Sequence, residues 1–279
     1  MPQVWPVGQD VGGFAANKRF YRRKRGSRKR WSDKFEAKVS NPESLPGQLK
    51  CKERTRRGGS VKLISLNVAL PRLVTYRTRT FKTGIYKQPV SGPVVLRTLN
   101  LDGDRQADLV AHGGPNKAVY GYPSEHYDFW RQELPGAQLP WGMFGENFTT
   151  EGLFEPDLHI GDRLAIGTAI LVVRQPRIPC YKLGAKFYRS DILGRFLDSG
   201  RSGFYFSVER EGIVEAGHEF TILSRDPDAI TIAEMNRLFA HDIYNRALFE
   251  KAIHSAALPE DWRDHLKKRF AASPQPLSS

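Results

Sequence analysis

The stretch VKLISLNVAL, residues 61–70, decides the fold class of this 279-residue chain. Ile64, Leu66, Val68 and Leu70 fall at alternate positions, which is the period of a strand that buries one face. We therefore expect a strand here, with these four side chains facing a core.

Four further segments favour strands: PVVLRTLNL (93–101), RLAIGTAILVV (163–173), GFYFSVE (203–209) and EFTILSR (219–225). Helical patterns in this part of the chain are limited to residues 124–134 and 191–200. Many short strands with few crossover helices favour an antiparallel, barrel-like sheet over a parallel sheet wrapped by helices. The fold class is predicted as mainly β, with one β-barrel domain over residues 61–228.

Beyond residue 229 the apolar period becomes helical. Thr231 followed by Glu234 has the spacing of a capping box, and two more amphipathic helices fit 243–256 and the stretch from Pro259 onward. The sequence therefore predicts a small three-helix region over residues 229–271, followed by a tail over 272–279.

Most of the net charge of +13 lies in the first sixty residues. Residues 1–60 contain 16 Lys and Arg against 5 Asp and Glu, whereas residues 61–279 contain 27 against 25. With little apolar periodicity, this segment is predicted to be a disordered basic extension. Such an arm could bind nucleic acid through phosphates, act as a localisation signal or transit peptide, or be a solvated tail.

A further interpretation of residues 1–60 is an over-extended gene start. Val61 could be a GTG start codon translated as an internal valine, and the preceding RRGGS is what a purine-rich ribosome-binding site would encode. Peptide mapping of the natural protein tests this, since abundant peptides from residues 30–55 would contradict it.

The number of cysteines and the hydropathy pattern indicate the cellular compartment of the protein. Cys51 and Cys180 could form at most one bridge, and no secretory signal pattern opens the chain. No apolar stretch approaches the roughly 20 residues that cross a bilayer. We therefore expect a cytoplasmic protein with no membrane partner.

Cys180 is the leading candidate for a functional side chain. It follows the apolar strand AILVV in the Pro-flanked segment RQPRIPCYKL, 174–183, at a strand end where scaffolds present reactive groups. Arg174, Arg177 and Lys182 lie near it in sequence, and cations favour a thiolate. The alternative is a small buried hydrophobe. Arg177 could hold an anionic ligand or be a surface charge; zinc and iron–sulfur sites are disfavoured, because no ligand set accompanies Cys180.

Four other residues are weaker candidates. His112 opens a His-Gly-Gly-Pro turn whose backbone could approach a ligand, and Lys117 could supply charge to an anion there. A histidine that only satisfies its turn is the alternative. Asn147, in FGENFTTEGL, and Lys87, in GIYKQPV, could each contact a ligand or serve their own loops.

Four motifs in order resemble the MOSC domain, the molybdenum-cofactor sulfurase C-terminal domain, and most closely its stand-alone YiiM-like subgroup. They are GDRQADLVAHGGPNKAV, FGENFTTEGL, IGD and VVRQPRIPCYKL, within a match from Val61 to about Phe270. The resemblance implies a MOSC-type β-barrel that binds Mo-molybdopterin, followed by three helices. It further implies Cys180 as the molybdenum ligand and a cofactor pocket formed by the side chains of His112, Lys117, Asn147, Arg177 and Lys87.

The resemblance also implies an oxidoreductase that reduces N-hydroxylated compounds of the hydroxylamino-purine type. No dinucleotide-binding motif or cluster cysteine set is present, so electrons should come from a separate flavoprotein or ferredoxin-type partner. The alternatives are a sulfur carrier with a Cys180 persulfide, and nucleic-acid binding by the basic arm. Pyridoxal phosphate is not expected in this chain.

Overall fold

Strands predominate from residue 62 to residue 224, as the alternation in the sequence predicts. The structure is a computed structural model that describes residues 60–107, 113–225, 227 and 229–271. His112, Cys51 and nearly all of the predicted extension and tail therefore lie outside the described residues. The strands are β1 (Lys62–Val68), β2 (Arg72–Tyr76), β3 (Arg79–Thr83), β4 (Gln88–Val90), β5 (Val94–Leu96), β6 (Val119–Pro123), β7 (Phe148–Glu151), β8 (Arg163–Ile166), β9 (Ala169–Pro176), β10 (Phe204–Arg210), β11 (Gly212–Val214) and β12 (Phe220–Ser224).

The helices fall into two groups along the chain. Those within the β region are α1 (His126–Glu133), α2 (Tyr181–Phe187) and α3 (Ile192–Asp198), with the 3₁₀ turns η3 (Pro115–Lys117) and η4 (Glu155–Asp157). The C-terminal group is α4 (Ile232–Ala240), α5 (Arg246–His254) and α6 (Glu260–Ala271), which confirms the three predicted helices. No helix of the described part of the chain is long and apolar enough to cross a membrane.

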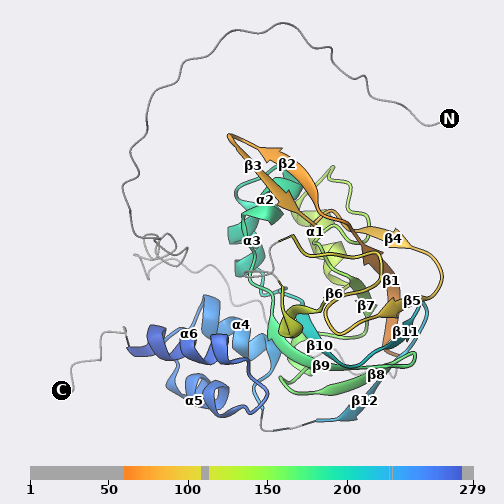
Figure 1. Ribbon diagram of the computed structural model, residues 1–279. Coiled ribbons are helices and arrows are strands. Elements are labelled where there is room, and N and C mark those ends of the chain that lie inside the picture. Colours follow the sequence, from red (N-terminus) through yellow and green to blue (C-terminus); the bar gives the residue numbers. More distant parts are fainter. Residues whose placement is uncertain (1–59, 108–112, 226, 228, 272–279) are drawn as a thin grey trace, which may run out of the picture. The chain divides into compact units, whose positions relative to one another are not determined.

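Eight strands form one sheet in the order β12-β8-β9-β10-β6-β7-β1-β4 (Figure 1). Every neighbouring pair is antiparallel except β6 with β7. The mainly β, mostly antiparallel fold is confirmed.

The predicted barrel is not closed by a continuous ladder. The edge of β1 that does not pair with β7 pairs with β4 at residues 66–68. Only the first residues of β1 reach β12, the strand at the other end of the sheet. There an isolated bridge joins Lys62 to Glu219, and the amide of Phe220 donates to the carbonyl oxygen of Val61 at 2.8 Å. Because β1 divides one edge between two partners, the sheet curves back on itself without full pairing.

Three of the predicted strands differ in detail. Of the predicted strand 93–101, only Val94–Leu96 forms β5, and an isolated antiparallel bridge joins Leu96 to Leu101. In β1 a register shift between Leu63 and Ser65 changes the face of the strand, so Leu63 and Leu66 are fully buried while Leu70 is 67% exposed. The segment 163–173 is a hairpin of β8 and β9 with Ile166 opposite Ala169, because Gly167 takes a φ of +55° in the turn.

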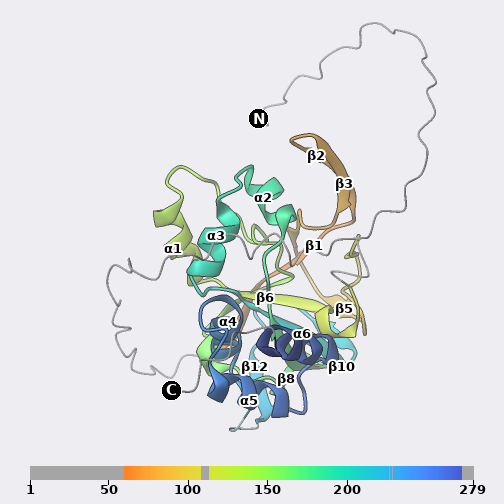
Figure 2. The same cartoon turned by 90° about the vertical axis from the view of Figure 1, so that its left-hand side faces the viewer.

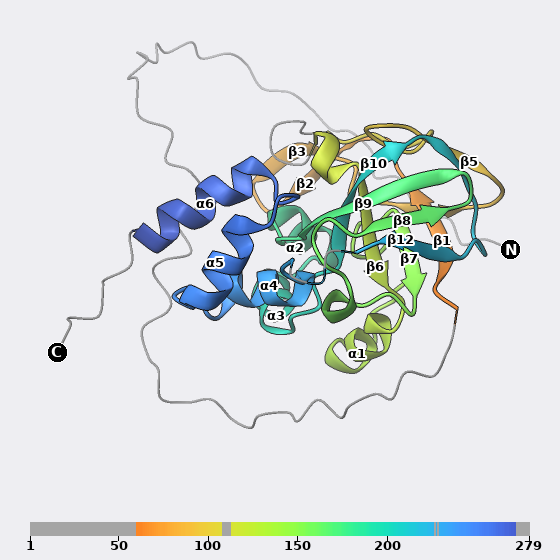
Figure 3. The ribbon, with the colours of Figure 1, turned by 90° about the horizontal axis from the view of Figure 1, so that it is seen from below.

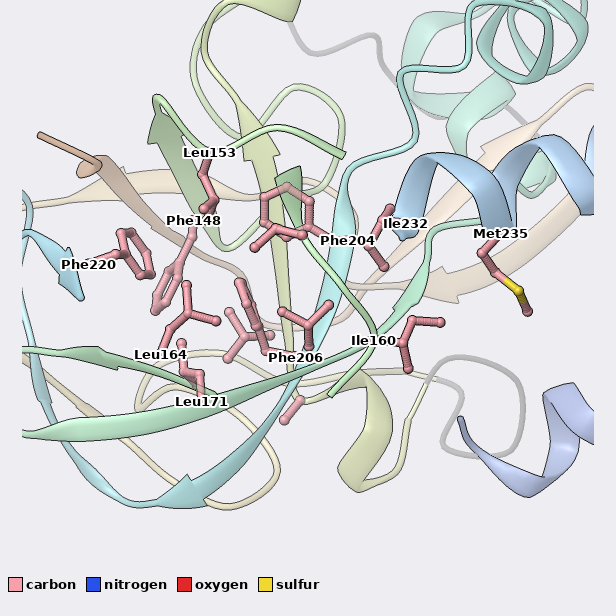
Figure 4. Packing of buried hydrophobic residues seen from close by; sticks show 14 of the residues in the cluster. Phe148, Leu153, Ile160, Leu164, Leu171, Phe204, Phe206, Phe220, Ile232 and Met235 are labelled. Carbon is pink, nitrogen blue, oxygen red and sulfur yellow. The ribbon is translucent and has the colours of Figure 1, made fainter. Parts of the chain in front are cut away.

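The three C-terminal helices share a core with the sheet. Ile232, Met235 and Leu238 of α4 belong to the same buried cluster as the strand residues Phe148 and Phe206 (Figure 4). Backbone bonds support this contact: the amide of Ile160 donates to the carbonyl of Ile230, and that of Ile232 to the carbonyl of Leu158. Figure 3 shows α4, α5 and α6 gathered on one side of the sheet.

A second core, largely aromatic, lies under α1 and α3. Its members include Tyr120, Tyr122, Trp130, Phe144 and Phe196, and the indole nitrogen of Trp130 donates to the hydroxyl of Tyr122 at 2.6 Å. This cluster supports the strand β6 and the loop before β7, which both reach the site described next.

Candidate functional site

One pocket brings together five of the six predicted site residues. It encloses about 660 Å³ including its open mouth. Lys87 precedes β4, Lys117 lies in η3, Asn147 precedes β7, and Arg177 and Cys180 lie between β9 and α2. Residues far apart in the sequence therefore come together in the pocket. Of the six predicted site residues, only His112 lies outside the described residues.

Cys180 presents a free thiol to this pocket. The residue follows β9 and a proline pair, is half-buried, and is the N-cap residue of α2 with an extended backbone (φ −125°, ψ 170°). Its side chain makes no capping hydrogen bond to the helix. The thiol is therefore not used for capping and is positioned to contact a ligand.

Arg177 is a buried cation three residues before the thiol. It is 5% exposed and its guanidinium lies over the rings of Tyr120 and Phe196, 5.1 Å from each centroid. Burial lowers its pKa, but Tyr120, Tyr205 and Cys180 raise it, and the pKa ends above its ordinary value. The guanidinium therefore keeps its charge.

One polar atom of Arg177 has no partner. Its Nη1 atom is buried and makes no hydrogen bond to a described residue, and no described carboxylate forms an ion pair with it. A buried charge without a counter-charge is costly, so an anionic ligand group at this atom would offset that cost.

Lys87 and Asn147 are tied into a buried network around Asp104. The amine of Lys87 forms an ion pair with Asp104, and burial lowers the pKa of Lys87 while Asp104 opposes that shift. The side-chain amide of Asn147 donates to Asp104 Oδ2 at 3.0 Å and to the carbonyl of Asn67 at 3.2 Å, and its oxygen accepts from the amide of Tyr120. Both side chains thus have protein partners, and their contact with a cofactor stays a prediction.

Asp104 itself is not among the predicted site residues. It lies in LDGDR, which has the composition of a turn, and nothing local indicates that its carboxylate is 1% exposed. Its Oδ1 also accepts from the amide of Ala69 at 2.8 Å, so this one side chain joins three loops behind the pocket.

The pocket is strongly cationic. Besides the residues already described, its lining includes Arg105, Lys182, Tyr205, Gln106 and Gly145, and among the described residues of the lining five are Lys or Arg and none is Asp or Glu. Lys182 is 7% exposed. Such a lining suits a ligand that carries phosphate or other anionic groups.

Lys186, one turn beyond Lys182 on α2, fixes the wall of the pocket. Its amine donates to the carbonyl oxygen of Ile85 at 2.8 Å and to that of Gly142. Burial lowers the pKa of Lys186 to about 7. The lysine thereby holds α2 against the loops that carry Ile85 and Gly145, which both line the pocket.

The side chains of the pocket suit a metal whose other ligands belong to a cofactor. No group of three or more His, Cys, Asp or Glu side chains that could hold a metal ion occurs among the residues that the structure describes. One soft thiolate beside several cations suits a metal bound through the sulfurs of a phosphate-bearing cofactor. Cys180 and Arg177 fit the metal end and the anionic groups of such a cofactor.

Two family models match the chain. The MOSC domain model matches residues 108–221, and the YiiM-like, 3-alpha helix domain model matches residues 230–272. The first interval contains Lys117, Asn147, Arg177 and Cys180, and the second contains α4, α5 and α6.

Relatives and solved structures agree with these models. The uncharacterized protein YflK of Bacillus subtilis is 41% identical over 207 residues, which cover 74% of this chain and 93% of that protein. Protein YiiM of Escherichia coli is 37% identical over 191 residues, covering 67% and 84%. A protein named Reductase from Gibberella moniliformis is 32% identical over 159 residues, covering 56% of this chain and 28% of that protein.

The crystal structure of YiiM from Geobacillus stearothermophilus matches with a TM-score of 0.64 at 34% identity, covering 75% of this chain and 99% of that chain. The family models, the relatives and this crystal structure all match the part of the chain that contains the sheet and the three C-terminal helices. The chain therefore belongs to the MOSC domain family and, within it, to the YiiM-like proteins.

Proposed function

We propose that this protein binds Mo-molybdopterin in the pocket and reduces N-hydroxylated compounds of the hydroxylamino-purine type. The observation that carries the proposal is the buried guanidinium of Arg177, with an unpartnered Nη1, beside the free thiol of Cys180 in a pocket lined by five cations. MOSC domains are associated with molybdenum-cofactor binding, which agrees with that donor set.

Each residue has a separate part in this proposal. Arg177, Lys117 and Lys182 would bind the anionic groups of the cofactor, and the Cys180 thiolate would ligate the metal. When bound, the cofactor supplies a metal that exchanges two electrons. Tyr205 lies on the pocket wall, where its hydroxyl can orient a polar substrate by donating a hydrogen bond.

The reaction requires electrons from outside the described chain. Reduction of R–NH–OH by two electrons and two protons gives R–NH₂ and water. We propose a reduced flavoprotein or ferredoxin-type protein as the donor and the cytoplasm as the compartment. The relative named Reductase supports an oxidoreductase-type activity, although this chain spans about a quarter of that protein.

A sulfur carrier is the second candidate, and the free thiol of Cys180 favours it. A persulfide on Cys180 would need a separate sulfur donor. Cyanide-releasable sulfur in protein that lacks molybdenum would support this candidate and contradict the reductase.

The deciding experiment measures molybdenum and pterin in protein made by a host that synthesises the cofactor. Cys180→Ser should keep the fold, because oxygen replaces sulfur with little change in volume, and should lose molybdenum, because the hydroxyl is a poor ligand. With dithionite-reduced methyl viologen as donor, reduction of a hydroxylamino-purine should fall by orders of magnitude.

Cys51→Ser is the matched control and should behave like the wild type. Full molybdenum content and normal turnover in Cys180→Ser would contradict both the reductase and the sulfur-carrier proposals.

A further inference from the structure

The β2–β3 hairpin extends away from the large sheet (Figure 2). Its side chains are largely exposed and basic. Residues 70–83 contain Arg72, Arg77, Arg79 and Lys82, all exposed, and no Asp or Glu. Within the described part of the chain, none of these four cations forms an ion pair. Several other exposed arginines are paired, as Arg163 is with Glu209. The hairpin therefore carries a positive charge that the protein itself leaves uncompensated.

One face of the hairpin is fixed to the pocket wall. Tyr76 contacts Tyr188, with ring centroids 5.6 Å apart, and Phe81 contacts Tyr181 at 4.9 Å, edge to face. Tyr181 is the first residue of α2 and Tyr188 is its C-cap residue, and α2 begins directly after Cys180. The end of β3 continues into the segment Thr83–Gly84–Ile85, which lines the pocket. A molecule docked on the hairpin would therefore lie near the mouth of the site.

The other face of the hairpin carries Leu73 and Lys82, whereas Arg79 lies on the face of Tyr76 and Phe81 and Arg77 lies in the turn. Leu73 is 73% exposed and pairs with Lys82 across the strands. Leu70, at the base of the hairpin, is 67% exposed. Exposed apolar side chains close to charges of one sign are typical of a protein docking surface, whereas binding of phosphate groups alone would not require an exposed leucine.

We infer that the exposed β2–β3 hairpin docks an acidic electron-transfer protein, which delivers electrons to the pocket. The inference rests on the proposed reductase function and adds the site and charge of the partner. The donor, a reduced flavoprotein or iron–sulfur protein, is oxidised by two electrons in total. The N–O bond of the substrate breaks, the hydroxyl leaves as water with one proton, and the amine nitrogen takes up the second proton. Unpaired cations would steer an acidic donor, and a small interface would release it between electrons.

The test reverses the hairpin charge with the triple variant Arg77→Glu/Arg79→Glu/Lys82→Glu. Arg72 is kept because its guanidinium stacks on Tyr86, 3.9 Å from the ring centroid. The control is Arg246→Glu/Lys267→Glu/Lys268→Glu, which makes the same charge change at exposed positions of α5 and α6. Leu73→Ser tests the apolar contact without a change of charge.

Two readouts separate the docking surface from the function. The first is the Kd of an oxidised, acidic ferredoxin at low ionic strength, which needs no turnover. The hairpin triple variant should weaken binding at least about ten-fold and remove its salt dependence, and Leu73→Ser should weaken it less; the α5–α6 control should bind within about two-fold of wild type.

The second readout compares donors. With reduced ferredoxin, kcat/KM should fall in the hairpin variant by the same factor as the affinity, while the rate with reduced methyl viologen should not fall. A wild type that is inactive with viologen would contradict the proposed function alone, since ferredoxin binding still decides the docking site. Equal ferredoxin binding by both triple variants, or hairpin-dependent binding of single-stranded DNA in place of ferredoxin, would overturn the inference.

Discussion

At the residue scale, the ion pair between Lys87 and Asp104 is buried, with the two side chains 7% and 1% exposed. Asp104→Asn leaves Lys87 buried without its counter-charge, and we expect the free energy of unfolding to fall by about 3 kcal/mol. Adding Lys87→Met should restore at least about 1 kcal/mol, because the orphaned charge is then removed. Urea denaturation of the two single variants and the double variant measures this coupling. Additive losses would show that the two charges do not stabilise each other.

Lys186 should give the protein a pH-dependent stability. Because burial holds its pKa at about 7, the unfolded chain keeps a proton on this amine that the folded chain has lost, from about pH 7 up to the ordinary lysine range. The unfolded state binds more protons in that window, so stability rises with pH there, by at most about 1.4 kcal/mol per pH unit. Below pH 7 both states are protonated and this contribution is flat.

Lys186→Met should therefore flatten the dependence of unfolding free energy on pH between 7 and 9. Urea denaturation at several pH values measures the slope, and Lys267→Met, at an exposed position of α6, is the matched control. The same slope in wild type and Lys186→Met would show that the amine keeps its proton in the folded protein.

The sequence could indicate Cys180 and Arg177, because a lone thiol among prolines and cations is unusual within ten residues. It could not indicate Asp104. The carboxylate matters only because β1, the turn after β5 and the loop before β7 meet, and its partners Ala69 and Asn147 lie 35 and 43 positions away. The role of Asn147 could not be predicted either, because its local sequence does not distinguish an asparagine that binds a ligand from one that hydrogen-bonds within its own loop.

At the scale of single elements, the start of α4 is fixed by a capping box. The Thr231 hydroxyl accepts from the amide of Glu234 at 3.1 Å, and the Glu234 carboxylate accepts from the amide of Thr231 at 2.9 Å. Thr231→Ala should lower the free energy of unfolding by about 1 kcal/mol. Denaturation with Thr78→Ala, at an exposed turn position, as the control measures this loss. No difference between the two variants would show that the cap adds nothing.

That capping box was predictable because its signal lies within four residues. The hairpin of β8 and β9 was predicted as one strand, because the apolar run 163–173 continues across Gly167, and its turn depends on that glycine taking a positive φ. The helix α2 was also missed. It is seven residues long, and its stability comes from burial of Leu183, Gly184 and Ala185 against the rest of the protein.

At the scale of the whole molecule, the shared core predicts that the three helices are not dispensable. A chain ending at Arg225 loses Ile232, Met235 and Leu238, which belong to the same cluster as the strand residues. We expect this truncated protein to lose its cooperative thermal transition, because its core is opened to water. Differential scanning calorimetry measures the transition.

Deletion of residues 1–59 is the comparison for that truncation. We predict an unchanged Tm and cofactor content, since the segment has too little apolar content to form a core. A normal Tm for the chain ending at Arg225 would instead show that the β region folds without the helices.

The divided edge of β1 has a consequence for synthesis on the ribosome. β4 can pair with β1 early, but β7 follows it by some eighty residues, and the bridge from Lys62 must wait for Glu219. Until then the nascent chain exposes an unpaired strand edge, which is a template for aggregation. We therefore expect slow refolding dominated by long-range pairing, and a yield that depends on chaperones holding β1 until translation is nearly complete.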